Sequence, residues 1–355
     1  MNCVRNGRGR SVFSCSLLTL CLIGALAATA AGQTGRADAP PDYSTYTQSY
    51  SIPFAKAVNF QHLTGMHIRA SLNGAPATTF QVDTGSTGIV VSADEVPNID
   101  PKAPTGSIKY SSSGLEFDGV WTTVTVTFPD SRDARGRVAT AVVPVLAVKE
   151  RKVYSVGVNA SGKKDALNPR VHMFGVGFGR GTEAHPEKNP FVNLAEMQAG
   201  TMRRGYAITR KGFTLGLTAA AVGTGYRFQK LTERKVSAET TTLRPGLKDW
   251  QTTPGSVTVD TLHAAMGTIL MIAMPEKTAT DDIAAGTRVT VDLLGGQLHY
   301  SFKVGDTADP LTPRKVTWIK PTHGVYVNTG LRALAAFDYL YDADSGYLGL
   351  RPTSP

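Results

Sequence analysis

One aspartate stands where a strand could present it to a cleft. A strand-like run at 78–82 leads into Asp83, and Thr84, Gly85 and Ser86 follow directly. A carboxylate at the end of a buried strand can work as a general acid or base, and the glycine beside it lets other backbone approach closely. Two carboxylates that share one proton can be acid and base together. The chemistry therefore depends on whether the chain supplies a second such aspartate.

Short strand-like segments surround this loop. Residues 66–72 alternate between apolar and polar types, Asn73 and Gly74 suit a tight turn, and 78–82 returns to Asp83. Further strands are expected at 107–110, 120–128, 138–148, 256–259, 268–273, 288–293, 298–304 and 314–319, and short helices at 193–198 and 331–337. Long helical patterns are scarce. The pattern predicts an all-β chain with closed or sandwiched sheets.

The first thirty residues have the pattern of a secretory signal peptide. Arg5, Arg8 and Arg10 precede an apolar run at 12–27, and small residues follow at 28–32. We expect this segment to be removed, leaving no integral membrane span and a secreted or periplasmic protein. The cysteines all lie within it: Cys3, Cys15 and Cys21. Disulfides and thiolate metal sites are therefore not expected in the mature chain.

The charge and the length of the chain narrow the function classes. The formal net charge of the 355 residues is +9, and loss of the three arginines of the signal leaves +6. No run of basic residues is interleaved with aromatics, so a nucleic-acid partner is not expected. We predict a signal peptide at 1–30, a linker or tail at 31–52, a first lobe at 53–220 and a second lobe at 221–355.

Two other features of the sequence, a glycine-rich string and the histidines, could indicate a cofactor or metal site. The glycine-rich string 175–181 could suggest a phosphate loop, but no strand, loop and helix with a following acid surround it. The seven histidines are scattered and form no metal-binding motif. The sequence therefore predicts neither a metal site nor a cofactor.

The order of the motifs resembles that of the pepsin-like aspartic peptidases. The loop at Asp83 is similar to the first catalytic loop of that family, and Tyr110 stands at the position of its flap tyrosine. The segment 174–179, which contains Gly175, is similar to the crossing strand that supports the loop. The tail 328–350 is similar to the last strand, helix and hairpin of the family. The resemblance implies an all-β, bilobal fold with an interlobe cleft.

The resemblance also implies a mechanism. In that family a water lies between two aspartates, one from each lobe; one takes a proton from the water while the other donates to the peptide carbonyl. Carried over, Asp83 would be the first catalytic residue. Thr84 would brace the loop, Ser86 would hydrogen-bond the carboxylate and Tyr110 would cover the substrate.

The second lobe departs from the family pattern at its catalytic position. Matching Gly267 and Thr268 to the motif places Ala265 where the aspartate belongs, and a slip of one residue gives Ala264. Asp260 is the acid nearby, but the motif glycine does not follow it. A turn after a strand is the simpler interpretation of Asp260. The sequence thus predicts an absent or severely impaired peptidase activity.

Three functional hypotheses follow from this combination. The preferred one is an exported, monomeric peptidase homologue that binds an extended peptide or protein segment in its cleft without cleaving it. The second is an active aspartic endopeptidase that pairs Asp83 with Asp260 or with another acid that folding brings in. The third is a structural envelope protein that keeps the fold without using the cleft.

Overall fold

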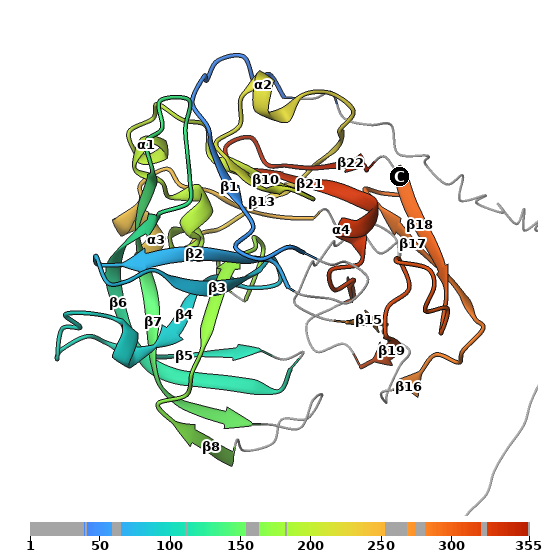
Figure 1. Cartoon of the computed structure of the whole chain (residues 1–355), viewed down its shortest axis with the longest axis horizontal. Coiled ribbons are helices and arrows are strands. Elements are labelled where there is room, and N and C mark those ends of the chain that lie inside the picture. Colours follow the sequence, from blue (N-terminus) through green and yellow to red (C-terminus); the bar gives the residue numbers. More distant parts are fainter. Residues whose placement is uncertain are drawn as a thin grey trace, which may run out of the picture. The chain divides into compact units, whose positions relative to one another are not determined.

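The computed structural model describes residues 39, 41–58, 65–110, 113–153, 163–181, 183–252, 268–274, 281–320 and 325–353. Across these ranges the chain forms the strands β1 to β22, with short helices between them (Figure 1). The predicted all-β class is confirmed. Among the helices of these ranges, none is long and apolar enough to cross a membrane.

The largest sheet holds the first candidate site. In spatial order its strands are β5 (Thr105–Tyr110), β6 (Leu115–Phe128), β2 (His67–Leu72), β3 (Thr78–Asp83), β9 (His172–Val176), β4 (Thr87–Ser92), β7 (Ala139–Val153) and β8 (Lys163–Leu167). The long strands β6 and β7 also pair with each other, so the strand order closes on itself. Strands β3, β9 and β4 lie in the middle of this order. Residues of β4 from Gly88 onward are all buried, as expected for a strand covered on both faces, whereas half of the residues of β3 are buried.

A second sheet joins early and late parts of the chain. Its six strands, in spatial order, are β1 (Tyr50–Pro53), β11 (Gly212–Leu215), β10 (Gly205–Thr209), β21 (Phe337–Asp342), β22 (Tyr347–Pro352) and β12 (Arg227–Lys230). Every pairing in it is antiparallel, and β10 meets β21 with Gly205 opposite Asp342. Strands from both sides of the predicted lobe boundary at 220 therefore pair within this one sheet.

Smaller sheets and short helices complete the described chain. The remaining strands are β13 (Thr232–Arg234) with β14 (Asp249–Gln251), β17 (Arg288–Leu293) with β18 (Leu298–Lys303), and the sheet β16 (Asp281–Asp282), β19 (Lys315–Ile319), β15 (Ile269–Ala273), β20 (Tyr326–Asn328). The helices are α1 (Ala195–Gln198), α2 (Ala219–Val222), α3 (Ala238–Leu243) and α4 (Ala333–Ala336), with single 3-10 turns η1 (Ala93–Glu95), η2 (Pro186–Lys188) and η3 (Pro190–Val192).

Aromatic side chains connect the two large sheets. Phe191, in η3, is fully buried and packs against Phe174 of β9 with ring centroids 5.6 Å apart. The same ring contacts Tyr206 of β10 at 5.4 Å and Phe213 of β11 at 5.2 Å, both edge-on. Aromatic pairs in this geometry contribute about 0.5–1.5 kcal/mol each beyond the area they bury. Strand β9, which supports the Asp83 loop, is thus anchored to both sheets.

Most of the strands expected from the sequence are present, with shifted ends. The expected strand 120–128 begins five residues earlier, at Leu115, and the strand expected at 138–148 continues to Val153. At the first hairpin, Asn73 and Gly74 both have positive φ, at 48° and 77°, as the turn prediction requires. The strand expected at 256–259 lies outside the described residues.

Candidate functional site

Asp83 is the last residue of β3 and is only 4% exposed. Its two carboxylate oxygens are held by the turn that follows. The backbone N–H of Gly85 donates to Oδ1 at 2.7 Å, and the hydroxyl of Ser86 donates to Oδ2 at 2.7 Å. Hydrogen bonds of this kind favour the ionised carboxylate. The sequence thus places Asp83, Gly85 and Ser86 in one small, ordered loop.

Strand β9 passes directly behind this loop. It runs parallel to β3, with Gly175 opposite Asp83, and antiparallel to β4, with Gly175 also opposite Gly88. A Cβ atom on Gly175 would lie 2.8 Å from the backbone oxygen of Gly88 and 2.8 Å from the hydroxyl of Ser86. A glycine is needed here because only it lets two backbones approach this closely.

Gly177, directly after β9, completes the support. The N–H of Gly177 donates to the carbonyl of Ser86 at 2.7 Å, and the carbonyl of Gly177 accepts from the hydroxyl of Thr87 at 2.7 Å. A Cβ atom on Gly177 would lie 2.2 Å from the carbonyl oxygen of Thr84. Backbone contacts on both sides therefore fix the loop that carries Asp83.

Thr84 is enclosed but incompletely bonded. The residue is 1% exposed, and among the described residues its hydroxyl has no hydrogen-bond partner. Its carbonyl oxygen accepts a hydrogen bond from Nη2 of Arg180 at 3.0 Å. The carbonyl of Thr84 is thus hydrogen-bonded to Arg180, while its buried hydroxyl can accept or donate a further hydrogen bond.

Tyr110 ends β5 and reaches toward the loop. Its ring packs edge-on against Phe117, with centroids 5.8 Å apart. The hydroxyl oxygen is buried, near the hydroxyl of Ser86. Burial raises the pKa of Tyr110, and the negative charge of Asp83 raises it further. The phenol therefore stays protonated and can donate to a ligand at Asp83.

The candidate residues of the second lobe are mostly outside the described ranges. Asp260, Ala264, Ala265 and Gly267 fall there, so the structure places none of them against Asp83. Thr268 is described: it is half-buried, directly precedes β15, and its carbonyl accepts from the N–H of Arg314 at 2.8 Å.

A charged network behind the loop was missed in the sequence. Arg180, which contacts Thr84, follows Gly179 in the glycine-rich string 175–181. Asp249 of β14 accepts from the N–H of Gly179 at 3.3 Å and pairs with Arg234 of β13 at 3.2 Å. Sequence separation conceals this network, because Gly179 and Asp249 are 70 residues apart, Gly181 and Arg234 are 53 apart, and the residues share no motif.

A buried amide and a buried phenol support the same end of β9, between Gly175 and Gly177. Nδ2 of Asn189 and the hydroxyl of Tyr206 both donate to the carbonyl of Val176 at 2.7 Å. The side-chain oxygen of Asn189 accepts from the N–H of Phe191 at 2.9 Å and so begins η3. The sequence signal for this bracket is the Asn-Pro pair at 189–190, which is typical of a turn.

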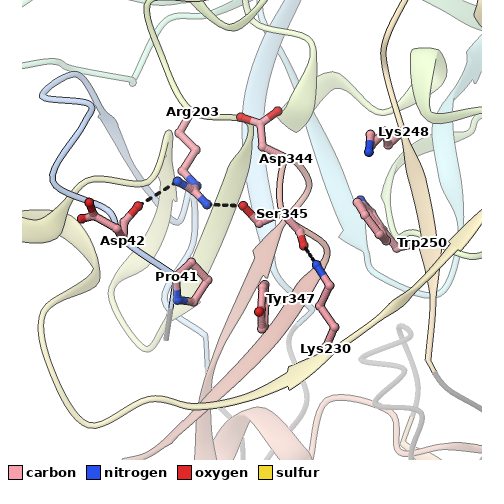
Figure 2. A pocket seen from close by; sticks show the side chains of 9 residues that line it. All are labelled: Pro41, Asp42, Arg203, Lys230, Lys248, Trp250, Asp344, Ser345 and Tyr347. Carbon is pink, nitrogen blue, oxygen red and sulfur yellow. Dashed lines mark hydrogen bonds between the residues drawn. The ribbon is translucent and has the colours of Figure 1, made fainter. Parts of the chain in front are cut away.

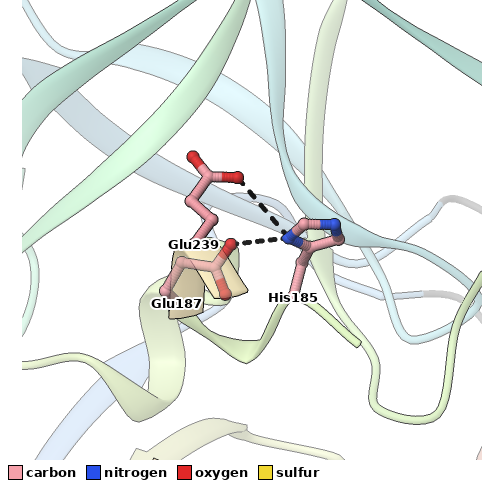
Figure 3. A group of neighbouring side chains, drawn as sticks. All are labelled: His185, Glu187 and Glu239. Carbon is pink, nitrogen blue, oxygen red and sulfur yellow. Dashed lines mark hydrogen bonds and ion pairs between the residues drawn. The ribbon is translucent and has the colours of Figure 1, made fainter. Parts of the chain in front are cut away.

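Figure 3 shows a compact group of metal-ligand types in His185, Glu187 and Glu239, whose ligand atoms lie within 4.8 Å of one another. Nδ1 of His185 is 2.8 Å from Oε1 of Glu187 and 3.7 Å from Oε2 of Glu239. The hydroxyl of Thr240 donates to the other oxygen of Glu187. Because these groups are bonded to one another, the set acts as a clasp, which we call the His185 clasp, between η2 and α3.

A surface hollow of about 470 Å³ lies at the turn between β21 and β22 (Figure 2). Its lining residues are Pro41, Asp42, Arg203, Lys230, Lys248, Trp250, Asp344, Ser345 and Tyr347. Arg203 donates to the carbonyl of Asp42 and to the hydroxyl of Ser345, and the ammonium of Lys230 lies 4.5 Å from the ring centre of Tyr347. The polar groups of the hollow bond to one another, and Asp83 does not line it.

Comparisons with known proteins give a limited likeness. No family model matches the chain, and no curated protein matches it. Among solved structures, the chain is similar to an aspartic proteinase from Irpex lacteus, with a TM-score of 0.46 and 16% identity over 87% of this chain and 98% of that one. A likeness of this extent does not say which residues act.

Proposed function

We propose that this chain is an exported, two-lobed homologue of the pepsin-like aspartic peptidases that binds extended peptides without cleaving them. The first lobe, 53–220, supplies a complete carboxylate loop and a covering tyrosine. The second lobe, 221–355, lacks the matching aspartate. The pattern of residues 1–30 supports export to a secreted or periplasmic location, and the protein works as a monomer.

The observation that carries the proposal is the geometry of Asp83. Its carboxylate is nearly buried, both oxygens are hydrogen-bonded within the loop, and β9 crosses behind it with Gly175 and Gly177 in backbone contact. An aspartate that only capped a turn would need neither this burial nor a crossing strand. The arrangement is that of a carboxylate held ready for a ligand.

The chemistry of cleavage requires more than this loop provides. Peptide hydrolysis by carboxylates needs one group to take a proton from water and another to donate to the carbonyl oxygen. With alanine at 264 and 265, the sequence offers no acid in either register of the second motif. One carboxylate cannot perform both roles in the same step, so binding without turnover is expected.

Binding of an extended peptide can use the hydrogen-bonding groups of Asp83 and Tyr110. Asp83 can accept a hydrogen bond from a ligand, and the protonated hydroxyl of Tyr110 can donate one. An extended segment gains affinity from main-chain hydrogen bonds and specificity from pockets for alternate side chains. The buried hydroxyls of Tyr110 and Thr84 are groups to which a bound backbone can hydrogen-bond.

The test is a binding measurement with a defined probe. A fluorescent peptide with a central statine residue would be titrated with the full chain, and anisotropy would report the Kd. We expect saturable binding that weakens about tenfold or more in Asp83→Ala, because the hydroxyl of statine loses its acceptor. Tyr110→Ala should weaken binding as well.

A surface acid provides the matched control. Asp94, in η1, is exposed, and Asp94→Ala should leave the Kd unchanged. Equal affinities for wild type and Asp83→Ala would contradict the proposal and favour the structural envelope role. Cleavage of the probe by wild type that is absent in Asp83→Ala would instead support an active endopeptidase.

A further inference from the structure

Arg180 places a positive charge beside the Asp83 loop. Its Nη2 donates to the carbonyl of Thr84, the residue that follows Asp83, at 3.0 Å. Tyr339, Asp83, Tyr206 and Asp249 each interact electrostatically with the guanidinium and act to raise the pKa of Arg180. No part of the peptide-binding proposal above uses this cation.

The segment that carries Arg180 is fixed from β13 and β14. Asp249 accepts from the N–H of Gly179 at 3.3 Å, and Arg234 donates to the carbonyl of Gly181 at 3.0 Å and pairs with Asp249 at 3.2 Å. Gly179 has φ +65°, and a Cβ there would lie 2.8 Å from the carbonyl oxygen of Trp250. Two charged side chains and one close backbone approach therefore hold the turn in a single conformation.

The surroundings of Arg180 strengthen its effect. Desolvation lowers the pKa of Arg180, and the neighbouring Tyr339 and Asp83 oppose that change. A guanidinium keeps its proton under all ordinary conditions, so the group remains a cation. A charge that is shielded from solvent acts on a nearby carboxylate more strongly than an exposed one does.

We propose that Arg180 is a positioning residue that keeps Asp83 ionised, and that Asp249 and Arg234 hold it in place for that purpose. The proposal rests on the proposed function and deepens it by assigning the charge state of the site. An acid pair needs one protonated carboxyl, whereas this site presents an anion from neutral to mildly acidic pH. Peptide binding at Asp83 then does not depend on acidification.

The experiment is a titration of Asp83 in the ligand-free full chain. Aspartate labelled with 13C at Cγ would be followed by NMR as the pH is lowered, and the signal of Asp83 assigned by its loss in Asp83→Asn. We expect the wild-type midpoint to lie below about 3.9, the ordinary value for aspartate. In Arg180→Gln, which keeps a donor for Thr84 but loses the charge, the midpoint should rise.

Two variants separate charge from structure. Arg180→Lys keeps the cation and should restore a midpoint near that of wild type. Arg170→Met removes an exposed arginine that pairs with Glu95 at 3.3 Å, and it should not move the Asp83 midpoint. If Arg180→Gln does not fold, Arg234→Gln, which frees the carbonyl of Gly181, should raise the midpoint in its place.

The outcomes are distinct from those of the binding test because no ligand is present. A wild-type midpoint at or above about 3.9 would overturn the inference, whatever the peptide affinity. An Arg180→Gln midpoint that moves no further than that of Arg170→Met would overturn it too. A low midpoint that rises in Arg180→Gln and returns in Arg180→Lys supports it even if the statine peptide does not bind.

Discussion

At the scale of single residues, one hydroxyl and one backbone N–H of the following turn donate to the Asp83 carboxylate. Ser86 and Gly85 donate to different oxygens, each at 2.7 Å. Hydrogen bonds to a charged acceptor contribute more to stability than those between neutral groups. The loop is therefore stabilised by the same contacts that orient its carboxylate.

Replacing Ser86 by alanine tests this dependence. Ser86→Ala removes the hydroxyl that donates to Oδ2, and we expect the free energy of unfolding at neutral pH to fall by about 1.5 kcal/mol or more. Urea titration followed by circular dichroism would measure the change. Ser113→Ala is the control, because that exposed hydroxyl makes a long, 3.4 Å hydrogen bond to the carbonyl of Tyr110. A loss in Ser86→Ala no larger than in Ser113→Ala would show that the hydroxyl does not hold the carboxylate.

At the scale of elements, β9 sets the shape of the site through its glycines. The sequence predicted that the segment 174–179 crosses behind the loop, and the register places Gly175 opposite Asp83. At Gly177 the approach is tighter, since a Cβ would lie 2.2 Å from the carbonyl oxygen of Thr84. Backbone cannot move away from such a contact as a flexible side chain can.

A methyl group at this crossing should therefore be costly. Gly177→Ala is expected to lower the free energy of unfolding by about 3 kcal/mol or more through overpacking, and to abolish binding of the statine peptide. Differential scanning calorimetry and the anisotropy assay would measure the two effects. Gly136→Ala is the control, because Gly136 has φ +77° but no atom lies near its Cβ position. That variant adds backbone strain without a clash and should lower the free energy of unfolding by only about 1 kcal/mol. Similar costs for the two variants would contradict the crossing geometry.

The His185 clasp gives an element-scale prediction about pH. Burial acts to raise the pKa of Glu187, but hydrogen bonds from His185 and Thr240 outweigh it and leave the pKa below the ordinary 4.5. A depressed carboxyl pKa stabilises the fold above the unfolded-state value, and that stability is lost as the pH falls through the folded-state pKa. Glu187→Gln should thus destabilise the protein most above pH 4.5, with a difference from wild type that narrows on acidification.

Urea titrations at several pH values would follow that difference. Glu233→Gln is the matched control, because Glu233 pairs with Lys248 at 3.0 Å on the surface and its side chain is 53% exposed. Its effect on stability should be small at every pH. A Glu187→Gln difference that widens as the pH falls would contradict the assignment.

The sequence predicted which segments near the site form strands more accurately than it predicted where those strands begin and end. Alternation and turn residues located 66–72 and 78–82, since a half-buried hairpin has a strong period of two. Strands β6 and β7 extend beyond their apolar cores because each pairs with the other along its whole length. The added residues of each strand are held by pairing with residues distant in the sequence, and no local pattern indicates that pairing.

At the scale of the whole molecule, the six-stranded sheet unites the two predicted lobes. Strands β1, β10 and β11 come from before residue 220, and β12, β21 and β22 come from after it. Beside the β10 to β21 pairing, Arg203 binds Asp342 through two nitrogens at 2.8 and 3.3 Å, with side chains 9% and 0% exposed. Breaking one partner of a buried pair leaves an uncompensated charge.

Arg203→Met should therefore weaken the whole fold. We expect a loss of about 3 kcal/mol or more in the free energy of unfolding, because Asp342 remains buried without its partner. Arg69→Met is the control, since Arg69 pairs with Asp130 at 3.3 Å on the surface, and its loss should cost no more than about 1 kcal/mol. Chemical denaturation would measure both. Equal effects would show that the pair does not join the two parts of the sheet.

The candidate site was predictable only in its local part. Asp83, Ser86 and Gly175 belong to contiguous motifs, so residue type and spacing indicated them. Arg180 could not be recognised, because its role depends on Asp249 and Arg234, which folding brings from another hairpin. A buried cation has no sequence signature when its partners are distant along the chain.

We propose that Asp83 belongs to a site that binds peptide without cleaving it. The most direct measurement incubates the purified full chain with denatured protein substrate from acidic to neutral pH and detects new termini by mass spectrometry, with Asp83→Ala in parallel. We predict the same absence of new termini in both. Cleavage by the wild type that disappears in Asp83→Ala would contradict the account and establish an active peptidase.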